Sequence, residues 1–314
     1  MQPFLFSDSS ACLHVSPAMK ISVIIPVYND PSGIDATLRS VMEQDHSDYE
    51  VIPVDNNSTD RTPTVIQEWA HQYPNRIRPA YEHDTQSSYA ARNAGIEAAQ
   101  GEILVFIDAD MAAPSYWLTD VHEAFSTSEA DYLGYEVDVY VPEDEAGFWG
   151  WYDTVMGLPS RYHYDEKQFV PTSCLAVRRA VFEKVGRFDE TAVSGGDKEF
   201  GERVHRHPDL TTAFRDDIVV CHPARTTFEA HRAKALRVGR GLARLCDPST
   251  ASGDTTSVLI ELLLHAVPPD PRRVAEQAHD VPAHQFLRLY IADWILRYLR
   301  LYGALTYCRK EAPE

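Results

Sequence analysis

The feature that most constrains the fold is an apolar run, Ile103 to Ile107, that leads directly into Asp108-Ala109-Asp110. A continuous run of β-branched and aromatic residues predicts a strand buried on both faces, as in a parallel sheet covered by helices. Ligands of open α/β sheets bind at the carboxyl ends of the strands, so we expect both carboxylates at a binding site. Two neighbouring carboxylates repel each other and favour a divalent cation bound through oxygen. The alternative is a polar loop whose acids only cap the next helix.

Two earlier segments repeat this pattern. Residues 21–26 and 49–54 are predicted strands, and the apolar spacing within 33–44 predicts a helix between them. We expect the first strand to end at Pro26, because proline cannot donate to a sheet ladder. The second strand ends in acid, at Asp55. Strands that alternate with helices predict the α/β class, with a mostly parallel sheet and right-handed crossovers.

Length and charge limit the possible functions. A chain of 314 residues is long enough for one large α/β domain with a helical extension. Its formal charge is −18, with 47 acidic residues, six lysines and 23 arginines. Such a surface repels nucleic acid, so we expect no nucleic-acid partner. Salt screening makes a dense negative surface tolerable, which suggests a halophilic source as a hypothesis.

The cysteines and the N-terminus indicate the compartment. No CxxC pair occurs among Cys12, Cys174, Cys221, Cys246 and Cys308, which favours a reducing cytoplasm. Residues 1–18 lack the basic segment and apolar core of a secretory signal. We expect them to be a disordered leader, or an artefact of the assigned start, ahead of Met19. No stretch reaches the roughly 18 apolar residues of a membrane span. The expected location is therefore cytoplasmic, with a peripheral position on the inner membrane face as an alternative.

Two common phosphate-binding motifs are absent. The first predicted strand is not followed by GxGxxG, and the chain contains no GxxxxGK[ST]. The segment 87–99 is a predicted helix of small residues that carries one arginine, Arg92. A nucleotide would therefore have to be held by the acids at the strand ends, a cation and Arg92.

Four motifs in order along the chain resemble family 2 glycosyltransferases with the GT-A fold. They are Ile24-Ile25-Pro26-Val27-Tyr28-Asn29, Val54-Asp55-Asn56-Asn57-Ser58-Thr59-Asp60, Ala91-Arg92-Asn93-Ala94-Gly95 and Phe106-Ile107-Asp108-Ala109-Asp110. The resemblance extends from about Lys20 to about Arg244. It implies one Rossmann-like GT-A domain over 19–246, with a nucleotide-binding half at 19–115 and an acceptor half at 116–246. A helical extension would follow at 255–314.

The resemblance also implies a donor site. Pro26, Val27 and Tyr28 would line the nucleotide base, and Asp55 would accept hydrogen bonds from it. Asp108 would contact the ribose, with Ala109 beside it and Arg92 near the nucleotide, while Asp110 would bind the Mn²⁺ or Mg²⁺ that bridges the diphosphate. Two alternatives remain open: Tyr28 as a tyrosine at the edge of the core, and Arg92 as a helix-surface arginine paired with Asp84 or Glu97.

Two residues of the second half complete the implied site. Asp197 matches the aspartate of the family's Glu-Asp pair, which is the general base of an inverting transfer. Gly196 stands where the family has glutamate, which leaves the class of acceptor open. The alternative role for Asp197 is a helix N-cap. His222 follows a late strand where many members have a third metal ligand, and the alternative is a structural histidine.

Two aromatic segments have no assigned chemistry. The aromatics of 145–170 suit either a sugar-binding platform or a helix packed on the sheet. Residues 284–308 are a predicted helix whose broad apolar stripe lies opposite Arg297, Arg300 and Asp293. That stripe suits peripheral membrane contact, or packing on the catalytic domain or on a second copy.

The sequence thus predicts a metal-dependent hexosyltransferase. It would move a sugar from a nucleotide-diphosphate donor to a hydroxyl of a glycan or lipid-linked sugar, in glycan or cell-envelope biosynthesis. A catalytically weak nucleotide-sugar-binding scaffold is one alternative. A sugar-phosphate nucleotidyltransferase is another, although the glycine-rich, lysine-bearing loop of that class is absent. Processive synthesis is disfavoured, because the chain has neither membrane spans nor a QxxRW element.

Overall fold

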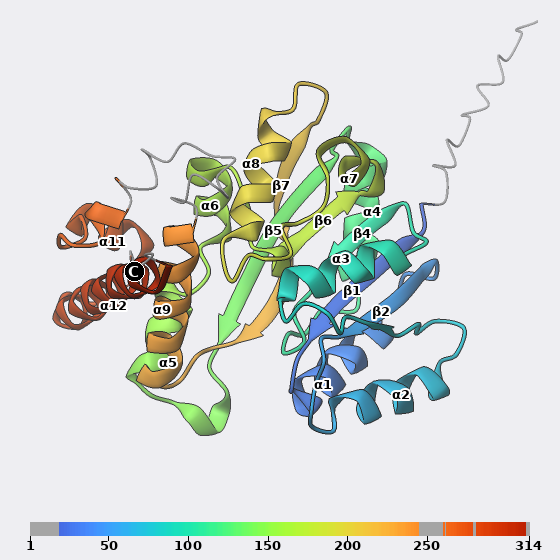
Figure 1. Ribbon diagram of the computed structural model, residues 1–314, viewed down its shortest axis with the longest axis horizontal. Helices are drawn as coiled ribbons and strands as arrows, with labels where there is room; N and C mark the ends of the chain where they lie inside the picture. The colour runs from blue at the N-terminus through green and yellow to red at the C-terminus, as the bar shows by residue number, and fades with distance from the viewer. Residues whose placement is uncertain (1–18, 245–259, 261, 279–280, 312–314) are drawn as a thin grey trace, which may run out of the picture.

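One mixed sheet organises the chain. The computed structural model describes residues 19–244, 260, 262–278 and 281–311, so the predicted leader at 1–18 lies outside the described residues. The described strands form a seven-stranded sheet in the order β3-β2-β1-β4-β6-β5-β7 (Figure 1). They are β1 (Ile21–Val27), β2 (Tyr49–Asp55), β3 (Ala80–Tyr81), β4 (Ile103–Phe106), β5 (Tyr132–Tyr140), β6 (Leu175–Arg178) and β7 (Thr212–Pro223).

The strand directions bring several predicted site residues to one edge. β1 pairs in parallel with β2 and β4, β2 with β3, and β5 with β7, whereas β6 runs antiparallel between β4 and β5. The predicted α/β fold with a mostly parallel sheet is confirmed. Val27 lies opposite Asp55, and Ile24 lies opposite Phe106. The carboxyl ends of β1, β2 and β4 therefore share one edge of the sheet.

The prediction that β1 ends at Pro26 is wrong. The strand continues to Val27, and Pro26 pairs with Val54 of β2. On the other side β4 already stops opposite Ile24, so no ladder bond to β4 is lost where proline lacks an N–H.

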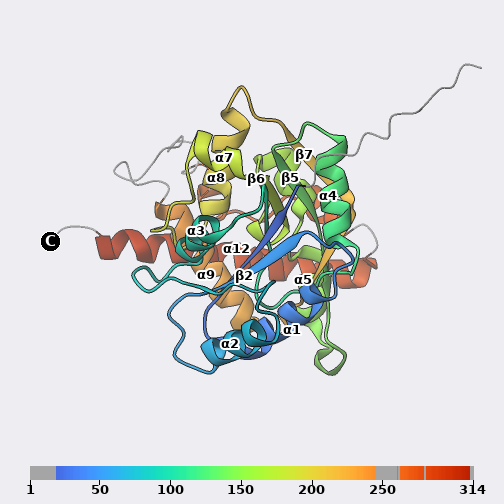
Figure 2. The ribbon, with the colours of Figure 1, turned by 90° about the vertical axis from the view of Figure 1, so that its right-hand side faces the viewer.

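Helices cover both faces of the sheet, and Figure 2 shows α3 and α4 on opposite sides. The helix α1 begins at Pro31, and the Asp30 carboxylate accepts a hydrogen bond of 2.8 Å from the Gly33 N–H. The helices are α1 (Pro31–Met42), α2 (Thr62–Gln72), α3 (Ser88–Ala98), α4 (Trp117–Thr127), α5 (Phe148–Met156), α6 (Ser160–Lys167), α7 (Arg179–Val185), α8 (Gly196–Arg206), α9 (Phe228–Arg244), α11 (Pro271–Gln277) and α12 (Ala283–Glu311). Two 3₁₀ turns lie at Glu143–Glu145 and Thr172–Cys174.

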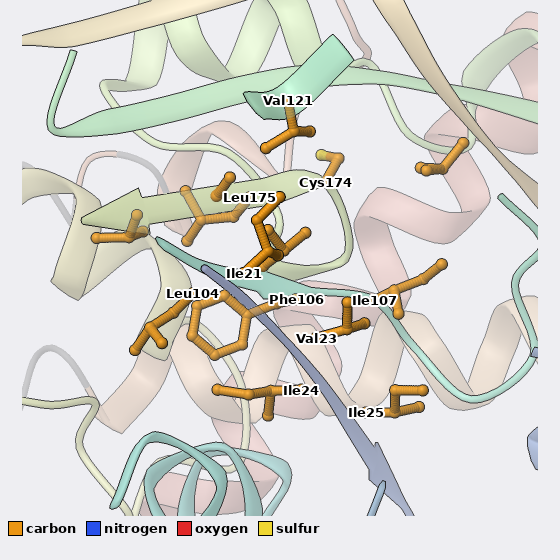
Figure 3. Packing of buried hydrophobic residues seen from close by; sticks show 14 of the residues in the cluster. Ile21, Val23, Ile24, Ile25, Leu104, Phe106, Ile107, Val121, Cys174 and Leu175 are labelled. Carbon is orange, nitrogen blue, oxygen red and sulfur yellow. The ribbon is translucent and has the colours of Figure 1, made fainter. Parts of the chain in front are cut away.

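The strands that lead to the site are buried throughout. Ile24, Phe106 and Ile107 have no exposed surface (Figure 3), and each contributes roughly 1.5–3 kcal/mol to the free energy of folding. The helix α3 lies close to β1 because it is built from small residues. A Cβ at Gly95 would come within 2.4 Å of Ile24 Cγ2. This close approach fixes the position of Arg92 on the same helix.

The C-terminal helices pack on α9 and α5, on the side away from the sheet (Figure 1). The helix α12 crosses α9 at two glycines. A Cβ at Gly239 would lie 1.9 Å from the Arg300 carbonyl oxygen, and a Cβ at Gly303 would lie 2.5 Å from the Leu236 carbonyl oxygen. The extension is therefore held directly against α9.

The face of α12 that packs coincides with the predicted stripe only in part, at Phe286, Tyr290 and Leu299. Asp293 is buried and accepts a hydrogen bond of 3.2 Å from the Tyr152 hydroxyl of α5, and Leu296 is buried on the same face. This face of α12 packs on α5 and α9 because Asp293 finds a hydrogen-bond partner there and because glycines at the crossing let the two backbones approach closely. Much of the predicted stripe is exposed, namely Leu287, Ile291, Trp294, Ile295, Tyr298 and Tyr302. Within the described chain, no helix is long and apolar enough to cross a membrane.

The aromatic residues of α5 belong to the core of this helical layer. Phe148, Trp149 and Trp151 pack on the buried cluster that contains Tyr152 and Leu289. The Trp149 ring centroid lies 5.3 Å from that of His231. These three rings therefore belong to a packed helix, although their partners in this cluster are other helices and not the sheet of the predicted alternative.

Candidate functional site

The two carboxylates after β4 lie in a turn that is tied to α1. The Thr37 hydroxyl donates a hydrogen bond of 2.7 Å to the Met111 carbonyl oxygen. The start of α1 lies so close that a Cβ at Gly33 would be 2.5 Å from the Ala109 carbonyl oxygen. These contacts hold the turn while the Asp108 and Asp110 side chains remain 37% and 45% exposed. The carboxylates are thus fixed in place and open to a ligand.

Arg92 lies in this site rather than on the helix surface. Its guanidinium donates to Asp108 Oδ1 over 2.6 Å, and its side chain is only 6% exposed. The predicted alternative of a surface arginine paired with Asp84 or Glu97 is wrong, because Glu97 pairs with Arg187 instead. A charge-assisted bond of this length fixes both partners.

Asp110 faces His222 from the end of β7. Asp110 Oδ1 lies 3.8 Å from His222 Nε2, and His222 Nδ1 lies 2.6 Å from the Pro223 carbonyl oxygen. A carbonyl only accepts, so we assign the proton to Nδ1, which leaves a lone pair on Nε2 towards Asp110. Burial raises the Asp110 pKa and so does the charge of Asp108, while His222 and Arg225 lower it.

One carboxylate oxygen and one imidazole nitrogen are a donor set that suits Mn²⁺. A bound cation would also offset the cost of holding the partly buried Asp110 carboxylate next to the charge of Asp108. The residues present therefore fit the implied metal. Among the residues that the structure describes, no group of three or more acidic, histidine or cysteine side chains could hold a metal ion. The side chains that would hold such a cation are therefore Asp110 and His222.

The ends of β1 and β2 form the neighbouring part of the edge. Tyr28 is 50% exposed, which leaves its side chain accessible at this edge of the sheet and fits both a ligand contact and the core-edge alternative. Pro26 and Val27 are buried beneath it. Asp55 is 3% exposed, and its Oδ1 accepts a hydrogen bond of 3.3 Å from the Ser58 N–H.

Asp197 lies in the first turn of α8, but it is not the N-cap. The N-cap is Gly195, whose φ of +84° favours glycine. Asp197 Oδ1 instead accepts from the N–H of Lys198 at 3.0 Å and from the Tyr89 hydroxyl at 3.2 Å. Burial raises the pKa of the Asp197 carboxyl, and both hydrogen bonds and the charge of Arg92 oppose that rise.

Tyr89 is a further residue of the site that no sequence motif singles out. This residue lies one helical turn before Arg92 on α3, and the Arg92 guanidinium carbon lies 5.5 Å from the Tyr89 ring centroid. One face of α3 thus contacts Asp108 through Arg92 and Asp197 through Tyr89. The sequence does indicate that Tyr89 lies on the same helix face as Arg92, because residues three positions apart on a helix share a face.

Comparison with known proteins gives the same family as the motifs. Residues 22–186, more than half of the chain, match the family described as "Glycosyl transferase family 2". "Glycosyltransferase AglE" of Haloferax volcanii is 31% identical over 301 residues, which cover 94% of this chain and 98% of that protein. "Validoxylamine A glucosyltransferase" of Streptomyces hygroscopicus subsp. jinggangensis is 29% identical over 67% of this chain and 57% of its own length.

Solved structures share the fold. The mannosyltransferase PcManGT from Pyrobaculum calidifontis, solved with GDP-Man and Mn²⁺, superposes with a TM-score of 0.62 at 17% identity, over 94% of this chain and 88% of that one. The S. aureus protein TarS (residues 1–349), solved with UDP-GlcNAc, gives a TM-score of 0.52 at 18% identity, over 92% and 89%. The motifs, the sheet and the family match together establish that the chain belongs to glycosyltransferase family 2 and is a glycosyltransferase of the GT-A fold.

Proposed function

We propose that this glycosyltransferase moves a sugar from a nucleoside-diphosphate donor to a hydroxyl group, with inversion at the anomeric carbon. The observation that carries the proposal is the Arg92–Asp108 pair beside Asp110 and His222 at the carboxyl edge of the sheet. A fixed guanidinium next to open carboxylates suits a ribose and a cation-bound diphosphate. The PcManGT and TarS structures, solved with GDP-Man and UDP-GlcNAc, support a donor of this class.

The proposed donor site follows the edge of the sheet. Tyr28, with Pro26 and Val27 beneath it, stacks on the base, and Asp55 accepts its hydrogen bonds. Asp108 and the neighbouring Ala109 contact the ribose, and Arg92 orients Asp108. Asp110 and His222 would hold Mn²⁺ or Mg²⁺. The cation supplies Lewis-acid stabilisation of the charge on the departing diphosphate.

Asp197 is the proposed general base. The acceptor oxygen forms a bond to the anomeric carbon as the bond from that carbon to the diphosphate oxygen breaks. The electron pair of the broken bond leaves with the nucleoside diphosphate, and the hydroxyl proton passes to the Asp197 carboxylate. Attack opposite the leaving group inverts the configuration. The acceptor proposed here is a glycan or a lipid-linked sugar.

A donor screen tests this proposal. We expect one of the UDP-, GDP- or dTDP-sugars to raise the unfolding temperature in the presence of Mn²⁺, because a ligand of the folded state stabilises it by mass action. The same sugar nucleotide should be hydrolysed slowly to the nucleoside diphosphate without an acceptor. Pyrophosphate release would instead identify a nucleotidyltransferase. Binding with no turnover, even with glycan and lipid-linked acceptors, would identify a scaffold.

The exposed stripe of α12 is the surface proposed for peripheral membrane contact. It consists of Leu287, Ile291, Trp294, Ile295, Tyr298, Tyr302 and Leu305. Aromatic and aliphatic residues without acids suit the boundary between headgroups and acyl chains. Arg288, also exposed, adds a positive charge beside the stripe in a protein of net charge −18. The apolar side chains are therefore the proposed basis of this contact, and a phospholipid surface is its proposed partner.

Vesicle flotation tests the role of this stripe. We expect the protein to float with vesicles that contain phosphatidylglycerol, and the double variant Ile291→Glu/Tyr298→Glu to remain at the bottom. Tyr116→Glu, at an aromatic residue 52% exposed near α4, should float like the wild type. A dimer that dissociates in the double variant, without flotation of the wild type, would assign the stripe to self-association.

A further inference from the structure

We propose that Tyr89 is a positioning residue for Asp197, and that Gly196 lacks a side chain because the Tyr89 ring occupies its place. The inference deepens the proposed function and rests on Asp197 being the general base. The sequence motifs single out Asp197 and Gly196 but not Tyr89, which meets both of them.

The first observation is the geometry at the carboxylate. The Tyr89 hydroxyl and the Lys198 N–H both reach Asp197 Oδ1, at 3.2 and 3.0 Å. Two donors on one oxygen, one from α3 and one from α8, fix the plane of the carboxyl group. The other oxygen, Oδ2, then has a defined direction in which to accept a proton.

The second observation is that the Tyr89 ring is held in place. It is 6% exposed, and its centroid lies 5.9 Å from that of Phe188. Arg92, itself fixed by Asp108, covers the ring. The phenol hydroxyl thus has little freedom, and its hydrogen bond to Asp197 is set by the packing of α3.

The third observation concerns Gly196. A Cβ at this position would lie 2.9 Å from Cζ of Tyr89 and 3.0 Å from both of its Cε atoms. Because the ring is buried and packed, it could not move aside without shifting its hydroxyl. The glutamate that the family pattern has at this position would therefore displace the phenol from Asp197. Tyr89 and Gly196 form a matched pair.

The hydrogen bond also has an electrostatic effect. A donor to a carboxylate favours its ionised form, which is the form that accepts a proton. The Tyr89 hydroxyl thus opposes the rise that burial causes in the Asp197 pKa. The groups that interact with this carboxyl or with its phenol partner are Arg92 of α3, the Lys198 N–H of α8, Arg237 of α9, Tyr132 of β5 and Cys174 of the turn Thr172–Cys174.

The test is the pH profile of kcat in Tyr89→Phe. Loss of the donor raises the Asp197 pKa, so the acid limb of the profile should move to higher pH by about one unit. The donor KM should stay unchanged. Tyr49→Phe is the matched control, because it also removes a buried phenol hydroxyl, which donates over 2.8 Å to the Val41 carbonyl. Tyr49 begins β2 and so lies at the other end of that strand from Asp55 and the site. Its profile should match that of the wild type, and an unshifted profile in Tyr89→Phe would overturn the proposal.

A second variant tests the matched pair. Gly196→Ala should shift the acid limb in the same direction, because the new methyl group pushes the ring away from Asp197. In the Tyr89→Phe background the same substitution should add little further shift, since no hydroxyl remains to be misplaced. Fully additive shifts would show that the two residues act independently.

A readout without turnover separates this inference from the proposed function. In protein with ¹³C-labelled aspartate carboxyl groups, the signal missing from Asp197→Asn identifies Asp197. We expect its titration midpoint to rise by about one pH unit in Tyr89→Phe. If the donor screen found no turnover, a raised midpoint would still support the Tyr89 contact. An unchanged midpoint in an active enzyme would refute the contact alone.

Discussion

Asp197→Asn is expected to lower kcat by roughly 10²- to 10⁴-fold, the usual contribution of a general base. An amide nitrogen cannot take the acceptor proton, whereas the side chain keeps its shape and its oxygen can still accept from Tyr89 and Lys198. The measurement is steady-state transfer with saturating donor and acceptor, together with the donor-induced rise in unfolding temperature.

The donor-binding readout is the control for this variant. Asp197 is not among the proposed donor contacts, so the donor should raise the unfolding temperature of Asp197→Asn as much as that of the wild type. Full activity in a folded variant would exclude Asp197 as the base. Loss of donor binding together with activity would assign it a structural role at the start of α8 instead.

Asp110→Ala should reduce metal-dependent turnover by about a hundredfold or more. The reason is that a bound cation would contribute several kcal/mol of transition-state stabilisation, which the variant would lose. The variant loses the carboxylate that faces His222 Nε2 across 3.8 Å. Two measurements check this: the rate against Mn²⁺ concentration, and Mn²⁺ binding followed by electron paramagnetic resonance. Both should lose their saturable component.

Asp48→Ala is the charge-matched control, since Asp48 is exposed just before β2, at the opposite end of the strand from Asp55. It should leave the dependence on Mn²⁺ unchanged. His222→Ala should weaken Mn²⁺ binding less than Asp110→Ala, because it removes a neutral donor. Undiminished activity of Asp110→Ala at limiting Mn²⁺ would remove the metal assignment.

The donor half of the site was the more predictable part. Strands that end in polar residues are visible as apolar runs followed by acids, and parallel pairing brings such ends to one edge. Asp55, Asp108 and Asp110 follow from that rule. The motif placed Arg92 near the nucleotide but did not predict its ion pair with Asp108. The choice of carboxylate depends on how closely α3 packs on β1, which the sequence does not give.

The contacts across the site could not be read from the sequence. Tyr89 meets Asp197 over a separation of 108 residues, and apolar periodicity does not encode such a tertiary contact. The packing face of α12 was predicted only in part, for a related reason. An aspartate on a helix suggests a solvent-facing side until its partner is known, and here that partner is Tyr152 on α5.

The crossing of α9 and α12 at Gly239 and Gly303 bears on how the chain folds as a unit. At these two positions the backbones of α9 and α12 touch directly, with no side chains between them. We therefore infer that the two helices fold and unfold together. Loss of α12 would uncover Tyr152 of α5 and Ala235 of α9. The C-terminal helix would thereby contribute to the stability of the part of the chain that contains α5 and α9.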